Sequence, residues 1–376
     1  PDCGPGGRRF TDHSGGLSGT CVGGSQPIDA SIDMMPPIDA LVCYGTGPSG
    51  PGLLRICFAA APTAAFPVST NTTINTDSSS MCLTPVSGGS GYCVIAATTI
   101  PITAKLRAIG SKPLVLIAAD SITVSTAMGF IDVGSHRGDT DRAAGANPTA
   151  CAAGMAPGTR AGGAGGTFAG KGGKGGNAAG GGGGNGGQAA DPASTTTLRG
   201  GCAGQDGNGG GKGIGGRGGG AVYLIAGNRI DIGGAGINAS GEGGAPGTPN
   251  ANVSSGAGGG GAGGMIGLDA PTVTSNTLIL ANGGGGGEGS GEAAAGGTGA
   301  DPSETDPAPG GSGNQIGGNG GLGSSVTTGG PGGDANAGAS AGGSDGGGGG
   351  GGGGAGLVKA PAGATLGALV SPQPAP

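Results

Sequence analysis

The chain has 376 residues, including 104 glycines and 26 prolines, and its formal net charge at pH 7 is −6. Glycine and proline inside a helix cost about 1 and about 3 kcal/mol relative to alanine, so this composition excludes a mainly helical protein. The glycines follow no strict Gly-X-Y repeat, which excludes a collagen triple helix. The negative charge argues against a nucleic-acid partner, because phosphate binding requires a basic surface. No apolar run approaches the ~18 residues of a membrane-spanning helix.

Charged residues make up only 10% of the chain. Disordered chains are usually rich in charge, so we expect the glycine tracts to be ordered. A chain that starts at Pro1, without Met or an apolar leader, is what removal of a signal peptide leaves, and we expect a secreted protein. A chain cut at this point for another reason would look the same.

An even number of cysteines indicates a disulfide framework. The eight cysteines are Cys3, Cys21, Cys43, Cys57, Cys82, Cys93, Cys151 and Cys202. There is no C-x-x-C pair, and the only histidines are His13 and His136, so a zinc site has little support. We expect four disulfides formed in an oxidising compartment. Among the many connectivities we prefer sequence neighbours: 3 with 21, 43 with 57, 82 with 93, and 151 with 202.

In chain order, β-rich stretches alternate with glycine-rich ones. We expect an N-terminal disulfide-bonded arm over 1–40, β-rich coils over 41–136, 221–241, 265–284 and 355–376, and glycine-rich insertions over 137–220, 242–264 and 285–354. The last stretch ends in a Pro-rich tail, and all of these parts are expected to form one continuous structural unit.

The β-rich stretches repeat one pattern. An apolar strand ends in Ala, a turn residue follows, and then come an alternating strand and a third short strand that leads into Gly or Asn-Gly. The copies are Cys93–Ser111, Leu114–Ser135, Ala221–Gly241, Met265–Gly284 and Leu357–Gln373, with Leu53–Asp77 as a looser relative. Three short strands in ~20 residues match one coil of a parallel β-helix. We therefore expect an all-β spine of about six coils with a narrow aliphatic core, although the pattern also allows coils flattened into stacked sheets.

The glycine-rich insertions are too long for ordinary loops inside a compact domain. Stretches such as GKGGKGGN at 170–177, GGNGGQ at 183–188 and GIGGRGGG at 213–220 have an approximate period of three. A polyproline-II-type helix has about three residues per turn. With glycine at two of three positions, backbones can approach closely enough to hydrogen-bond sideways. We therefore expect sheaves of polyglycine-II helices; the alternative is flexible linkers.

Several stretches resemble the glycine-rich, cysteine-containing secreted proteins of unknown function found in myxobacteria. They are LVCYGTGPSG and LLRICFAA within 41–60, CVIAATTIPITAKLRAIGSKPLVLIAADSITV at 93–124, IDVGSHRG at 131–138 and GGGGAGGMIGLDAPTVTSNTLILANGGGGG at 258–287. The resemblance covers most of the chain and implies location and architecture, but no activity. The glycine tracts also resemble, in composition, the polyglycine-II bundles of springtail antifreeze proteins and of a phage tail-tip adhesin.

A β-helical polysaccharide lyase or hydrolase would need a column of carboxylates on adjacent coils. Aligning the units places Asn238, Ala281 and approximately Arg107 at the position of Asp132, so the column is not rich in carboxylates. The corner of Asp120 likewise becomes Asn228, Pro271 and Thr98. Asp and Asn at such corners are explained by turn formation.

Other candidate sites are also weak. Neither histidine has a catalytic-triad signature, and we interpret Arg137-Gly138-Asp139 as a turn rather than an integrin-type motif. Asp139 and Asp141 could chelate an ion, whereas Asp206 and Asp345 are isolated in glycine. GxGxxG matches carry no information at this composition. We assign no catalytic, cofactor-binding or metal-binding residue.

An ice-binding surface would need a regular threonine ladder. Thr123 and Thr274 share a column, but Pro101 and Asp231 interrupt it. The leading hypothesis is an extracellular structural protein, not an enzyme, that assembles with itself into a fibre, sheath or bacterial surface layer. Its termini, at Pro1–Met35 or Ser371–Pro376, would contact a neighbouring copy. The main alternative is a monomeric surface adhesin that binds a surface glycan; a β-helical polysaccharide-active enzyme or an ice-binding protein comes third.

Overall fold

The computed structural model describes residues 41–50, 52–180, 182–192, 195–303, 306–313, 316–324 and 346–374. The chain divides into two units, Pro1–Leu41 and Val42–Pro376, and every feature below belongs to the second. The described residues form strands and no helix, which confirms the expected all-β class. None of them forms a helix that is long and apolar enough to cross a membrane. The expected arm over 1–40, with Cys3 and Cys21, lies outside the described residues.

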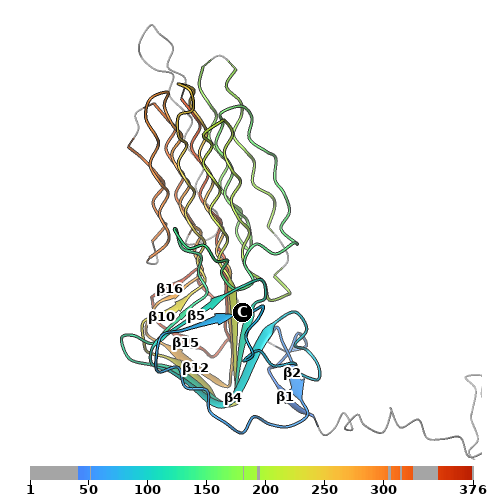
Figure 1. The fold of residues 1–376 in the computed structure, drawn as a ribbon. Coiled ribbons are helices and arrows are strands. Elements are labelled where there is room, and N and C mark those ends of the chain that lie inside the picture. The colour runs from blue at the N-terminus through green and yellow to red at the C-terminus, as the bar shows by residue number, and fades with distance from the viewer. Residues whose placement is uncertain are drawn as a thin grey trace, which may run out of the picture. The chain divides into compact units, whose positions relative to one another are not determined.

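Most strands belong to three parallel ladders, in which sequence order and spatial order agree (Figure 1). The first ladder joins the beginnings of β4 (Cys93–Ile102) and β6 (Leu114–Val124) to β8 (Ala221–Ala226), β11 (Met265–Asp269) and β14 (Leu357–Lys359). The second joins the ends of β4 and β6 to β9 (Arg229–Ile232), β12 (Thr272–Ser275) and β15 (Thr365–Leu366). The third contains β3 (Thr72–Asn75), β5 (Lys105–Ile109), β7 (Phe130–Asp132), β10 (Gly236–Asn238), β13 (Ile279–Leu280) and β16 (Val370–Ser371).

Equivalent apolar residues of successive repeats stack on one another in these ladders. In the second ladder Ile100, Ile122 and Ile230 are in register and fully buried. In the third, Ile131, Ile237 and Ile279 form a similar column. Together with the inward residues of the first ladder they form one narrow aliphatic core. Each column buries the apolar surface that an isolated repeat would leave in water.

The first ladder is also covered on its outer face. Val115, Ile117 and Tyr223 pack there against Leu54 and Phe168, which come from outside the ladder. β8 and the beginning of β6 therefore have apolar side chains on both faces, which explains why these stretches are continuous apolar runs rather than alternating ones.

The looser repeat over Leu53–Asp77 differs from the others. Its first strand, β2 (Ile56–Phe58), pairs antiparallel with β1 (Val42–Tyr44) instead of joining the first ladder. Only its last strand, β3, enters a ladder. The Cys43–Cys57 disulfide lies within the β1–β2 register, where it directly joins opposed residues.

The glycine-rich stretches form extended segments that run alongside one another (Figure 1). Backbone hydrogen bonds join the segments at 160–168, 170–178, 184–190, 200–208, 211–220, 239–248, 255–264, 281–290, 296–301, 308–312, 317–324 and 346–356. We call these the glycine segments. Neighbours of both directions occur: the 211–220 segment runs parallel to 255–264, whereas 239–248 runs antiparallel to it.

The 255–264 segment has a three-residue pattern of hydrogen bonds. The N–H groups of Gly258, Gly261 and Gly264 donate to the 239–248 segment at 2.8–3.0 Å. The N–H groups one position earlier donate to the 346–356 segment, and those two positions earlier donate to the 200–208 segment. The carbonyl groups of the segment accept hydrogen bonds from three further neighbours, at 160–168, 211–220 and 281–290. The segment is thus surrounded by six others, and all of its residues are buried.

At the periphery the same period leaves every third residue pointing outward. In the 170–178 segment Lys171 and Lys174 are exposed while the glycines between and after them are buried. In the 317–324 segment Asn319 and Leu322 are exposed in the same way. The two positions that face a neighbouring backbone are therefore glycine, and the third position, which faces outward, varies.

We predict that an interior glycine tolerates no methyl group. A Cβ at Gly260 would overlap the carbonyl group of Gly284, so Gly260→Ala should lower the free energy of unfolding by about 1–3 kcal/mol. The matched control is Gly363→Ala, where a Cβ meets no atom within 4 Å and the change should be within about 0.5 kcal/mol. Chemical denaturation of both variants measures the difference; equal stabilities would contradict the packing described.

Candidate functional site

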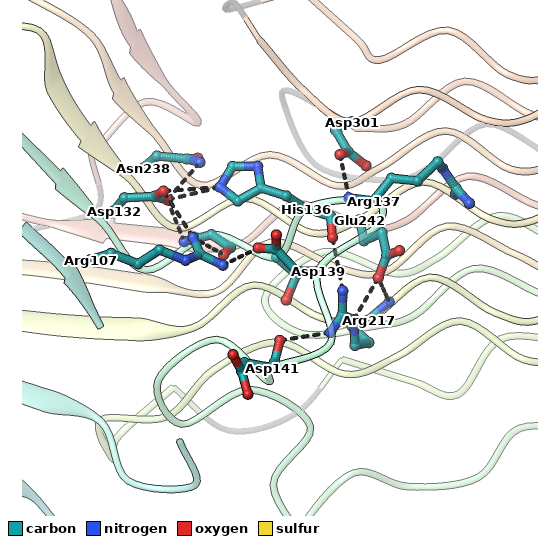
Figure 2. A network of polar contacts seen from close by, with 12 residues as sticks. Arg107, Asp132, His136, Arg137, Asp139, Asp141, Arg217, Asn238, Glu242 and Asp301 are labelled. Atoms are coloured by element: carbon teal, nitrogen blue, oxygen red, sulfur yellow. Dashed lines mark hydrogen bonds and ion pairs between the residues drawn. The ribbon is translucent and has the colours of Figure 1, made fainter. Parts of the chain in front are cut away.

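The most concentrated group of charged side chains lies where the third ladder meets the glycine segments. The chain leaves β7 at Asp132 and continues through residues 133–142, which contact the starts and ends of several glycine segments (Figure 2). The backbone N–H of Val133 donates to Asn238 O at 2.8 Å, and Ser135 Oγ donates to Gly218 O at 2.6 Å. We call this region the junction.

Asp132 is the centre of the junction. Its side chain is fully buried, and it forms ion pairs with Lys105 Nζ at 2.7 Å and Arg107 Nη1 at 2.8 Å and a hydrogen bond with His136 Nε2 at 3.0 Å. Asn238 Nδ2 and the backbone N–H of Gly134 donate further hydrogen bonds, at 3.4 and 3.1 Å. Asp132 therefore has partners on both carboxylate oxygens.

These partners decide the ionisation state of Asp132. Burial acts to raise the pKa of its carboxyl group, but the hydrogen bond and charge of His136, with Lys105 and Arg107, outweigh it. The pKa of Asp132 is consequently held well below its ordinary range. The carboxylate is ionised at neutral pH and saturated with donors, so it is suited to holding the junction together rather than to removing a proton from a substrate.

A second set of contacts ties residues 136–141 to the glycine segments. Arg217 donates to Glu242 Oε2 at 2.7 Å, to His136 O at 2.8 Å and to Asp141 O at 2.6 Å. The carboxylate of Asp301 accepts from the backbone N–H groups of Arg137 and Gly243, both at 2.8 Å. These side chains fix three glycine segments, which contain Arg217, Glu242 and Asp301, to one loop.

The Arg137-Gly138-Asp139 tripeptide forms a turn in this loop, as expected. The N–H of Asp139 donates to His136 O at 3.2 Å, and Gly138 has a φ of +86°. The Arg137 side chain bonds to Gly243 O, and the Asp139 carboxylate pairs with Arg107. Both charged side chains are thus used inside the molecule. The described residues contain no group of three or more His, Cys, Asp or Glu that could hold a metal ion.

The register refines the column predicted around Asp132. Asp132 lies between Arg107 and Asn238, as expected, but the next position is Leu280 rather than Ala281, followed by Ser371. The column contains a single carboxylate. The approximate alignment of Arg107 with Asp132 was the only sequence signal of the charge cluster; Lys105 and His136 lie outside that column and gave none.

Three disulfides are described, and each joins sequence neighbours, as expected: Cys43–Cys57, Cys82–Cys93 and Cys151–Cys202. Their Cα–Cα distances are 4.0, 4.8 and 5.6 Å. Cys82–Cys93 joins the start of β4 to the loop that covers it, and Cys151–Cys202 joins the chain after the junction to the 200–208 glycine segment. Cys3 and Cys21 are outside the described residues.

The threonine column on the outer face of the second ladder is interrupted, as the sequence predicts. Its residues in spatial order are Pro101, Thr123, Asp231, Thr274 and Thr365. Thr274 Oγ1 donates to Asp231 Oδ1 at 3.0 Å, so the central threonine is bonded to a carboxylate rather than continuing a hydroxyl array.

Comparison of the chain with protein-family models, curated proteins and solved structures finds no match. Its function must therefore be inferred from its own geometry.

We predict that Asp132→Asn destabilises the protein by about 3 kcal/mol, because it leaves a cluster of cations without their buried counter-charge. Asp231→Asn, at an exposed carboxylate, is the control and should change the stability by less than about 0.5 kcal/mol.

The same pair of variants has a defined pH dependence. A carboxyl whose pKa is lowered by folding contributes stability above its unfolded pKa of about 3.9 and loses it as the pH falls further. The stability difference between wild type and Asp132→Asn should therefore be constant near neutral pH and shrink below about pH 4. A difference that persists undiminished at pH 2–3 would show that Asp132 does not act through its charge.

Proposed function

We propose that this chain is an extracellular structural protein: a disulfide-bonded β-solenoid that carries a sheaf of polyglycine-II helices and assembles with other copies into a fibre, sheath or surface layer. The observation that carries the proposal is the 255–264 segment, which hydrogen-bonds to six neighbours with a three-residue period. Such a lattice uses nearly every backbone group for lateral contact and presents few side chains for chemistry.

The solenoid assignment is supported by the order of the ladders. Each of the five repeats from Cys93 onward contributes strands to all three ladders, and each ladder adds strands in chain order. Coils of this kind share one core between neighbours and need several copies for stability. The extracellular location is supported by the three disulfides, which persist in oxidising compartments.

Assembly through the ends of the ladders is disfavoured. At the β4 end, the N–H groups of Phe66 and Val68 donate to Thr99 O and Pro101 O at 3.0 and 2.9 Å, so that edge is already paired. At the other end, β14, β15 and β16 are only three, two and two residues long, and Pro361 and Pro372 follow β14 and β16. Short strands and prolines are the usual protection of a sheet edge.

The sides of the sheaf are better suited to self-association. Ile214 and Leu322 are 57% and 54% exposed on the outward rows of their segments. They stand among glycines, so a second sheaf can approach close to the backbone and bury both side chains. We therefore infer lateral association, with these apolar side chains as contacts.

An adhesin remains the second candidate because several turns between glycine segments gather at the end remote from the junction. Thr248 N–H donates to Gly211 O at 2.8 Å, which joins two such turns, and Asn250, Asn252 and Val253 are exposed there. Exposed polar residues on a rigid support could bind a surface glycan.

We expect purified, non-reduced protein to form filaments or sheets by negative-stain electron microscopy, and concentration-dependent assemblies by analytical ultracentrifugation. Ile214→Asp combined with Leu322→Asp should reduce assembly without changing the thermal midpoint. Met128→Asp is the control, since Met128 is 68% exposed but lies in a turn of the β region. Single particles at every concentration would reject the assembly proposal, and glycan binding by those particles would favour the adhesin.

A further inference from the structure

Arg199 is a buried cation beside a disulfide. Its side chain lies over the Phe168 ring, with Cζ 5.1 Å from the ring centroid, and the residue is only 8% exposed. Nη2 is 3.1 Å from Cys202 Sγ and 3.5 Å from Cys151 Sγ. Its remaining protein hydrogen bond is from Nε to Gly200 O at 3.3 Å.

Among the described residues, no carboxylate forms an ion pair with Arg199. Burying a guanidinium without an anionic partner is costly, and burial lowers the pKa of Arg199. Of the described hydrogen-bond partners of its guanidinium, Cys202 Sγ is the nearest, at 3.1 Å. A thiolate at Cys202 would supply the missing anion at hydrogen-bond distance.

The other two described disulfides have different surroundings. The Sγ of Cys82 faces the carbonyl oxygen of Thr76 at 3.9 Å, an environment that disfavours a thiolate. Arg55 is near Cys57 in sequence, but it is exposed, and no hydrogen bond from its side chain to the Cys43–Cys57 sulfurs is found among the described residues. Of these three disulfides, only Cys151–Cys202 has a guanidinium donating to both sulfurs.

We propose that Cys151–Cys202 is a thiol-exchange site that reacts with an extracellular dithiol, with Cys202 leaving as a thiolate paired with Arg199. Cys151 is half-buried whereas Cys202 is 7% exposed, so the incoming thiolate attacks Cys151 Sγ. A mixed disulfide forms at Cys151, the Sγ–Sγ bond breaks, and its electron pair leaves with Cys202.

The second thiol of the reagent then completes the reaction. As a thiolate it attacks the reagent's own sulfur in the mixed disulfide and releases Cys151, which takes up a proton. The protein disulfide gains two electrons, the dithiol is oxidised to a cyclic disulfide, and one of its two protons goes to solvent because Cys202 stays ionised. A thiol that leaves as a stabilised thiolate is a better leaving group and favours the reduced form.

Exchange at this site would change one connection only. The disulfide ties the turn in which Cys151 N–H donates to Pro148 O at 3.0 Å to the 200–208 glycine segment. Reduction removes this cross-link, while Cys43–Cys57 and Cys82–Cys93 remain.

The test is equilibration of the full chain in mixtures of reduced and oxidised dithiothreitol, followed by differential alkylation and mass spectrometry of each disulfide. The equilibrium constant for reduction of Cys151–Cys202 should exceed those of the other two at least tenfold at pH 7, equivalent to about 30 mV. Arg199→Met should remove this difference, whereas the matched variant Arg55→Met should leave all three constants unchanged.

The wild-type chain gives a second readout that needs no variant. Because reduction of Cys151–Cys202 releases one proton from the dithiol to solvent, its equilibrium constant should rise about tenfold per pH unit between pH 5.5 and 7.5. The constants of the other two disulfides, which reduce to neutral thiols, should not change. A pH-independent constant for Cys151–Cys202, or one equal to the others, would overturn the proposal.

Discussion

The sideways backbone hydrogen bond between glycine segments is the interaction on which the rest of the structure depends. Successive N–H groups of the 255–264 segment donate in three directions, and each direction meets a different neighbour. The approach is so close that a side chain at Gly260 would collide with the backbone of Gly284. Most residues that face a neighbour are therefore glycine, with small residues such as Ala257 and Ala262 at a few positions, and the abundance of glycine is a packing requirement rather than a sign of disorder.

The β ladders fix the register of the glycine segments relative to one another, which the lattice of glycine segments does not fix by itself. Three glycine segments lead directly into strands of the first ladder, at β8, β11 and β14, and two others leave the third ladder at β10 and β13. Parallel strands lie about 4.8 Å apart. The ladders therefore set the distance between the glycine segments that enter them and the position of each segment along its own length. Asp132, Arg217 and Asp301 then fix the connecting loop to the same segments. The aliphatic core and the glycine lattice thus form one structure with two kinds of packing.

Much of this architecture could be predicted because it repeats. The strands and their apolar columns follow from Ile and Val at period two, and the glycine segments follow from a period of three. The antiparallel β1–β2 pair was not predicted, because LLRICFAA also fits the repeat; the expected pairing of Cys43 with Cys57 was the one signal that distinguishes this stretch from the other repeats. The junction was missed for a related reason: Lys105 and Arg107 reach Asp132 from the preceding repeat through the pairing of β5 with β7, and His136 reaches it from the loop that follows β7. The contact of Arg199 with Cys202 depends on the path of a glycine segment, which its composition does not specify.

The glycine segments form one ordered lattice, and amide hydrogen exchange followed by mass spectrometry measures this order along the chain. Segments 255–264 and 281–290 have no secondary structure of the usual kind, so their protection can come only from lateral hydrogen bonds. We expect their amides to exchange as slowly as those of β6, which lies in the centre of the ladders. Complete exchange of both segments within seconds, while β6 remains protected, would contradict it.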